Sequence, residues 1–165
     1  MKEKRIRSYG ITIGELPTGR YNKITDVPGV TVGHSTIDTE EHKTGVTVVM
    51  PCQDNIFASK MLASCFVWNG FGKTTGLVQI KELGTLETPI VLTNTLNVGL
   101  MQDALVEYMV RRCEKDEVPL KSLNPVVAEC NDSYLNHISK RAVKEEHLFA
   151  AIDAATEDFQ MGDVG

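Results

Sequence analysis

The fold is decided by residues 89–100, which read PIVLTNTLNVGL. Ile90 to Leu92 form an aliphatic, β-branched run that is typical of a buried strand. A polar turn over 94–99 ends this strand, and a helix is predicted over roughly 99–115 because its apolar residues recur near helical spacing. Basic residues suit the carboxyl end of that helix, where they complement its dipole. This stretch therefore predicts a strand, a turn and a helix in direct succession.

Outward from this unit, strands and helices alternate without strict βαβ regularity. Strands are predicted at 46–50 and 126–129, with shorter ones among the turns of 9–37 and at 65–68. A second amphipathic helix is predicted over 143–158, whereas 77–80 fits a strand or a helix start and 53–64 a short helix or an irregular segment. No repeat, linker or low-complexity tract divides the chain. We therefore expect residues 1–165 to be a portion of a single domain of the α/β (α+β) class.

Composition and charge weigh against several classes of protein. Hydrophobic residues make up 42% and charged residues 24% of the chain, as in ordinary globular domains, and the net charge of −5 disfavours nucleic-acid binding. No apolar run is long enough for a membrane span, and the basic start lacks the apolar segment of a signal peptide, so we expect a cytoplasmic protein. The cysteines and histidines show no metal-ligand spacing, so we expect no metal site.

Three polar segments carry the residues best suited to chemistry. The first is the loop Asn69–Gly76, NGFGKTTG, which lacks the first glycine of a phosphate-binding loop because position 67 is Val. It fits either a tight turn or a loop whose glycines let backbone N–H groups approach a substrate. The second is the turn Thr93–Thr95, where Thr93 or Asn94 suits a helix cap and an asparagine amide can also hold a substrate carbonyl.

The third segment is Glu129–Asn136, ECNDSYLN, which follows a predicted strand. It fits Asx turns and a helix cap, or an amide donor aimed at a developing oxyanion. The serines of the chain lie in no G-x-S-x-G elbow, and Cys130 near His137 is weak evidence for a thiol pair. By its own residues, the chain looks like an active site without an attacking group.

Taken together, these segments resemble the DmpA-type aminopeptidases (L-aminopeptidase/D-esterase). The matching stretches follow one another over nearly the whole chain, and each is weak alone. They are Ile24–Val30 with Val32–His34, Thr44–Thr47, Asn69–Gly76, Thr93–Gly99, Glu129 with Tyr134–Asn136, and Gly162–Gly165.

The resemblance implies a four-layer α/β/β/α sandwich, shared with the ornithine acetyltransferase type and here incomplete. In that family one precursor cuts itself before a serine, which becomes the nucleophile at the start of the β chain. This chain ends at Gly165, before any such serine, and would correspond to the α-chain portion. The partners implied are the β chain of the same precursor, a small peptide or amino-acid amide substrate, and further αβ units in a homo-oligomer. No nucleic acid, membrane, metal or organic cofactor is expected.

The resemblance also implies roles for individual residues. Asn136 matches the oxyanion donor of the family. Two more asparagines are expected in the catalytic cleft, Asn94 and Asn69. The residues expected to bind substrate are Trp68, Gly70, Phe71 and Tyr134. Tyr108 is an alternative position for the family tyrosine, although its helix face reads more simply as core.

The leading functional hypothesis is an aminopeptidase or amidohydrolase that releases amino-terminal residues through an acyl-enzyme. Two rivals stay open at this point. A self-cleaving acyltransferase of the ornithine acetyltransferase type would expose a threonine and transfer the acyl group to an amine. A non-enzymatic relative would leave its precursor uncut.

Overall fold

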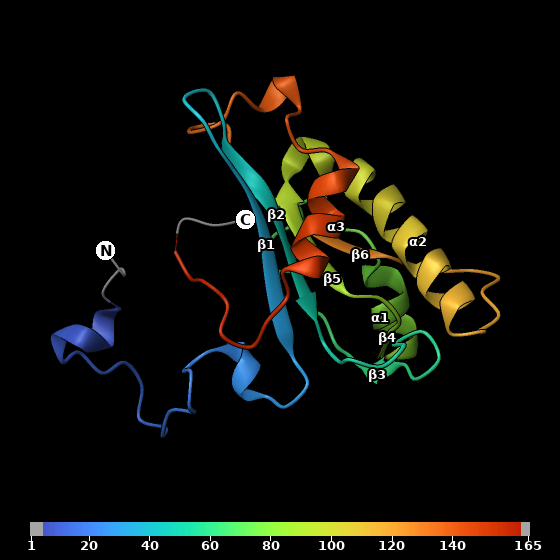
Figure 1. The fold of residues 1–165 in the computed structure, drawn as a ribbon, viewed down its shortest axis with the longest axis horizontal. Helices are drawn as coiled ribbons and strands as arrows, with labels where there is room; N and C mark the ends of the chain where they lie inside the picture. Colours follow the sequence, from blue (N-terminus) through green and yellow to red (C-terminus); the bar gives the residue numbers. More distant parts are fainter. Residues whose placement is uncertain (1–4, 163–165) are drawn as a thin grey trace.

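Four strands form the main sheet, in the order β1-β2-β5-β6 (Figure 1). The structure, a computed structural model, describes residues 5–162. β1 (Thr31–Asp38) pairs antiparallel with β2 (Lys43–Met50), and β2 pairs antiparallel with β5 (Ile90–Asn94). β5 pairs parallel with β6 (Val126–Cys130), and α2 (Val98–Lys115) supplies the crossover that parallel neighbours require.

Two helices cover one face of this sheet. α3 (Glu145–Asp153) packs on β1 and β2, α2 packs on β5 and β6, and the two helices contact each other. The side chains fully buried between these layers are Val46, Val48, Val91, Val127, Met101, Leu105, Met109 and Leu148. Burial stabilises by about 1.5–3 kcal/mol for each large apolar side chain, so this layer is the main source of cohesion. On the opposite face Leu92 remains 40% exposed. The described residues therefore form a two-layer unit, half of the expected four-layer sandwich.

One glycine sets the distance between β1 and α3. A Cβ built on Gly33 would lie 1.9 Å from the backbone oxygen of Ala151 in α3. No side chain can occupy that space, so only glycine lets the helix lie this close to the strand. α3 ends beside the same strand. Thr156, three residues after the helix, pairs with Val32 of β1, so the chain there can no longer be helical.

Short elements complete the chain. β3 (Met61–Leu62) and β4 (Thr85–Leu86) form a separate two-stranded pair, with α1 (Leu77–Leu83) between them. Single 3₁₀ turns lie at Ile6–Tyr9, Ile24–Asp26, Thr95–Asn97 and Ile138–Lys140. Within residues 5–162, no helix combines the length and the apolar character that a membrane span needs.

The central unit is confirmed, because β5 and α2 lie almost where residues 89–115 predict them. Three local predictions are wrong. Cys65–Trp68 is not a strand: it pairs with no strand of the described chain, and Phe66 and Trp68 instead meet edge to face at 6.1 Å. The second helix ends at Asp153 rather than 158, because Thr156 pairs with β1. No side chain of the described residues caps α2, since a 3₁₀ turn separates it from β5.

The sequence left two segments with two possible structures each, and the structure shows one of them in both cases. Residues 77–80 begin a helix, α1, and residues 53–64 are irregular apart from β3. The last matching stretch, Gly162–Gly165, is described only at Gly162, and Asp163, Val164 and Gly165 lie outside the described residues.

Candidate active site

A cavity opens at one end of the main sheet, and residues of the second and third candidate segments line it. β5 and β6 run parallel, so their carboxyl ends share one edge, and antiparallel β2 begins at that same edge. The cavity measures about 250 Å³. It is lined by Lys43, Thr44, Gly45, Thr47, Leu92, Thr93, Asn94, Glu129, Cys130 and Asp132. Topology alone therefore gathers residues that lie far apart in the sequence.

Asn94 is the most fixed polar group of this cavity. Its side chain is 2% exposed, and its Nδ2 donates to the Thr44 hydroxyl at 2.9 Å. Its Oδ1 accepts from Asn97 Nδ2 at 2.9 Å. Both ends of the amide are thus satisfied, which holds the donor group in one orientation beside the cavity. Asn94 does not cap α2, the role for which its sequence position suits it, but bridges β5 to β2.

Glu129 joins the other two segments. Its Oε1 accepts from the Lys73 backbone N–H at 3.3 Å, and its Oε2 accepts from the Thr95 hydroxyl. The carboxylate at the end of β6 therefore ties the glycine-rich loop to the turn after β5. Gly76 permits the loop to return close to β6, because a Cβ there would lie 2.5 Å from the Pro125 carbonyl oxygen and its φ is +80°.

Asn136 lies one residue layer behind the cavity wall. It is 5% exposed, and its Nδ2 donates to Asp132 Oδ1 at 3.1 Å, while its Oδ1 accepts from His42 Nδ1 at 2.8 Å. Asp132 itself lines the cavity. Asp132 belongs to the third candidate segment, but the sequence does not point to His42, which lies 94 positions away and carries no motif of its own.

An ion pair and a backbone hydrogen bond next to His42 hold the segment that carries Asn136 against the β1–β2 turn. The Lys140 ammonium lies 2.5 Å from Glu41 Oε2, and this hydrogen bond holds the pKa of the Glu41 carboxyl below its usual range. The Glu41 backbone oxygen accepts from the His137 N–H at 3.0 Å. The turn between β1 and β2 is therefore tied to the segment that carries Asn136.

The remaining predicted site residues lie outside the cavity. Trp68 is 89%, Phe71 82% and Tyr134 97% exposed, and Gly70 is exposed with them. Asn69 is exposed, and its Oδ1 accepts from the Phe71 N–H at 3.1 Å, which is an Asx turn. Tyr108 packs against the core on α2 and lines a different, smaller space beside Met50. Of the predicted cleft residues, only Asn94 lines the cavity. Asn136 lies behind Asp132, which is part of the cavity wall.

The polar side chains around the cavity are suited to hydrogen bonding. Among the described residues, no group of three or more His, Cys, Asp and Glu side chains is placed to hold a metal ion. The cavity is lined by one buried amide (Asn94), threonine hydroxyls, two carboxylates (Glu129 and Asp132), the Lys43 ammonium and the Cys130 thiol. The amide and hydroxyl donors among them can orient a carbonyl and stabilise negative charge on its oxygen.

The described residues match one half of a serine aminopeptidase whose fold is a variant of the Ntn hydrolase fold. The L-aminopeptidase D-Ala-esterase/amidase from Ochrobactrum anthropi, described as a prototype for the serine aminopeptidases and a new variant of the Ntn hydrolase fold, superposes with a TM-score of 0.88 at 33% identity. The sequence profile of Peptidase family S58 matches residues 22–165, and the chain belongs to this family, the DmpA-type aminopeptidases.

Further proteins with solved structures or known names are also similar to this chain. A beta-aminopeptidase from Burkholderia sp. is 41% identical with a TM-score of 0.91, and the PH0078 protein from Pyrococcus horikoshii OT3 is 47% identical with the same TM-score. Each superposition covers 98% of this chain, but only 46% and 48% of the other. The beta-peptidyl aminopeptidase BapA of Sphingosinicella xenopeptidilytica is 35% identical over 92% of this chain and 39% of its own length. The chain thus spans less than half the length of these relatives.

Proposed function

We propose that this chain supplies the substrate-orienting half of an aminopeptidase that releases amino-terminal residues from small peptides, amides or esters. The attacking serine would belong to the other half of the protein and would be freed by self-cleavage. One observation carries the proposal: two buried asparagine amides, Asn94 and Asn136, are fixed by side-chain partners at the edge of the sheet where the cavity opens. The relatives named beta-aminopeptidase and aminopeptidase support the same class of reaction.

In this scheme the serine hydroxyl attacks the substrate carbonyl, and an ester to the enzyme forms as the amine leaves with the hydroxyl proton. Water then hydrolyses this ester and releases the amino-terminal residue. The oxygen of that carbonyl gains negative charge in the transition state, and N–H donors stabilise it most when they are already oriented. Asn136 Nδ2 carries two hydrogens, and its bond to Asp132 uses one. We propose that the second is given to the oxyanion on the Asp132 side of the cavity, while the hydrogen bond from His42 to Oδ1 fixes the orientation of the amide.

The experiment uses the full-length protein, first checked by intact mass for two fragments that sum to the precursor. A serine after the cut agrees with the proposal, whereas a threonine there would favour an acyltransferase and an uncut precursor a non-enzymatic relative. In the processed enzyme, Asn136→Ala is expected to lower kcat for a small amino-acid amide by ~10²-fold or more.

The matched control is Gln53→Ala. It removes an exposed amide after the carboxyl end of β2, at the opposite edge of the sheet from the cavity. Its kcat should stay at the wild-type value. Unchanged turnover in properly processed Asn136→Ala would remove the oxyanion role from this residue.

A further inference from the structure

Three threonines lie in the wall of the cavity, and they differ in where their hydroxyl hydrogens go. They are Thr44, Thr47 and Thr93. A threonine hydroxyl has one hydrogen to donate and two lone pairs that accept. A hydrogen that is already given to a protein acceptor is not free for a substrate. The hydroxyl that keeps its hydrogen is therefore the one that can donate to a ligand in the cavity.

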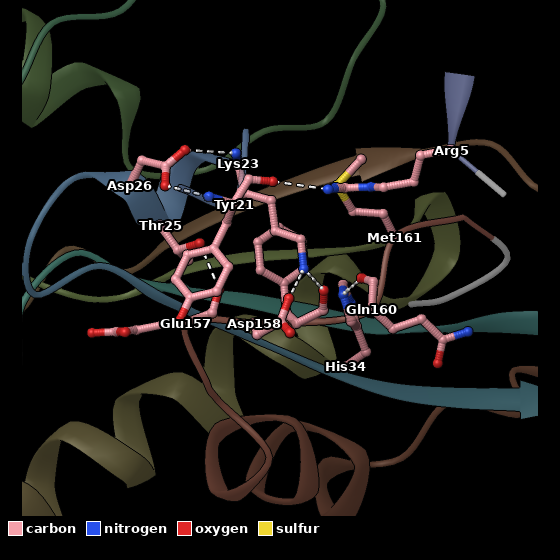
Figure 2. A network of polar contacts seen from close by, with 11 residues as sticks. Arg5, Tyr21, Lys23, Thr25, Asp26, His34, Glu157, Asp158, Gln160 and Met161 are labelled. Atoms are coloured by element: carbon pink, nitrogen blue, oxygen red, sulfur yellow. Dashed lines mark hydrogen bonds and ion pairs between the residues drawn. The ribbon is translucent and has the colours of Figure 1, made fainter. Parts of the chain in front are cut away.

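Two of the three hydroxyls are already committed. Thr93 Oγ1 donates to the Gly45 carbonyl oxygen at 3.2 Å. Thr47 Oγ1 lies 2.8 Å from His34 Nδ1, and Figure 2 shows the other side of the His34 ring directed at the Gln160 carbonyl, 3.0 Å from Nε2. Because a carbonyl oxygen only accepts, Nε2 carries the ring hydrogen, and Nδ1 of the neutral ring accepts the hydrogen of Thr47. Neither hydroxyl has a hydrogen left for a ligand.

Thr44 differs from both, because its hydroxyl accepts a hydrogen bond. Asn94 Nδ2 donates to Thr44 Oγ1 at 2.9 Å, and within residues 5–162 the structure shows no acceptor for the Thr44 hydrogen. Thr44 is only 5% exposed, and a buried donor without a partner costs about 1–3 kcal/mol. Since Thr44 lies in the cavity wall, the cavity is the space from which an acceptor can reach this hydrogen.

A chain of buried amides holds the Thr44 hydroxyl in place. Asn97 Nδ2 donates to Asn94 Oδ1 at 2.9 Å, and Asn94 in turn donates to Thr44. Asn97 is 0% exposed and, among the described residues, nothing donates to its Oδ1, so the hydrogen bonds run in one direction from Asn97 to Thr44. Hydrogen bonds in such a chain polarise one another, which strengthens the last donor. The chain therefore ends in a fixed O–H group beside the cavity.

We propose that the Thr44 hydroxyl is a second hydrogen-bond donor to the carbonyl oxygen of the substrate, and that Asn94 and Asn97 position it. The inference rests on the proposed function. This hydrogen bond strengthens as negative charge develops on the carbonyl oxygen of an amide or ester, and Asn136 is the other donor. Asn136 is next to the same cavity, because its Nδ2 is bonded to Asp132 in the cavity wall.

The test measures hydrolysis of a small amino-acid amide by the full-length protein, per processed molecule as counted by intact mass. Thr44→Val keeps the shape of the side chain and removes the hydroxyl, and it should lower kcat by ~10²-fold with little change in KM. Thr44→Ser keeps the hydroxyl and should keep most of the activity. Thr85→Val is the matched control, because Thr85 is half-buried in β4 of the separate two-stranded pair, and its kcat should equal that of wild type.

A double-mutant cycle separates a donor to the substrate from a residue that only holds Asn94. If Thr44 contacts the substrate, Thr44→Val should lower kcat by a further ~10-fold in protein that already carries Asn94→Ala. Unchanged kcat in Thr44→Val, or no further loss in the Asn94→Ala background, would overturn the inference alone. A wild-type protein that hydrolyses no amino-acid amide would overturn the proposed function with it. If Thr44→Val does not fold, Thr44→Cys, whose thiol is only a weak donor, is read in the same way.

Discussion

At the scale of the residue, His34 makes the stability of the protein depend on pH. The Gln160 carbonyl can only accept, so Nε2 carries a hydrogen, and in the neutral ring Nδ1 accepts from the Thr47 hydroxyl. Partial burial lowers the pKa of His34 below 6.5, and the hydrogen bond to Gln160 opposes this only in part. The unfolded chain therefore takes up the proton first as the pH falls.

The contribution of a neutral His34 is present above about pH 6.5 and is lost as the pH falls from there through the folded-state pKa. We expect the Tm of the full-length protein to fall between pH 7.5 and 5.5, and to fall less in His34→Gln, which does not titrate. Thermal melts at several pH values check this, and parallel curves for the two proteins would contradict it.

The partners of the site residues explain why the sequence predicts some of this site and not the rest. Asn94 and Asn136 stand out because of the motifs around them. Their partners Thr44 and His42 lie 50 and 94 positions away, and no sequence pattern pairs either one with its asparagine. For Trp68 and Phe71 the sequence shows apolar side chains beside a glycine-rich loop, but not the side of the loop on which they lie.

At the scale of the element, the packing of α3 on β1 depends on Gly33. Gly33→Ala would place a methyl group 1.9 Å from the Ala151 oxygen, so the helix must move away from the strand. Overpacking of this kind costs about 1–3 kcal/mol or more. Denaturant unfolding of the full-length protein should show that loss of unfolding free energy.

Gly99 supplies the control for this prediction. It is exposed in the first turn of α2, and nothing lies within 4 Å of the position that a Cβ would take there. Gly99→Ala is therefore expected to stabilise by about 0.5–1 kcal/mol, because alanine loses less backbone entropy in a helix. If Gly33→Ala and Gly99→Ala change the free energy of unfolding in the same direction, the close approach of α3 to Gly33 does not determine the packing.

Element types are predicted well where local pattern and tertiary environment agree. Residues 89–115 are β-branched and then amphipathic, and they become a central strand and a core helix. Cys65–Trp68 has strand-forming residues but no neighbouring strand within the described chain, so the ladder that would stabilise it cannot form. Residues after Asp153 continue a helical pattern, yet pairing with β1 takes them out of the helix.

At the scale of the whole molecule, the exposed aromatic side chains are the feature that a two-layer unit does not explain. Phe66, Trp68, Phe71 and Tyr134 are each more than four-fifths exposed, and Leu92 on the uncovered face of the sheet is 40% exposed. Such groups are costly to leave in water, and we expect further chain of the full-length protein to cover them. Relatives roughly twice as long as this chain have the material to cover them.

Trp68 can report on this covering, because it is the single tryptophan among the 165 residues. In residues 1–165 expressed alone, its emission should resemble that of tryptophan in water and should be quenched readily by acrylamide. In the full-length protein, the difference between wild type and Trp68→Phe isolates the same side chain, and its emission should be blue-shifted and protected. The isolated 1–165 should also associate, since its apolar surface has no other cover. A monomeric, cooperatively melting 1–165, with a Trp68 signal unchanged in the full-length protein, would mean that this loop faces solvent in the full-length protein as well.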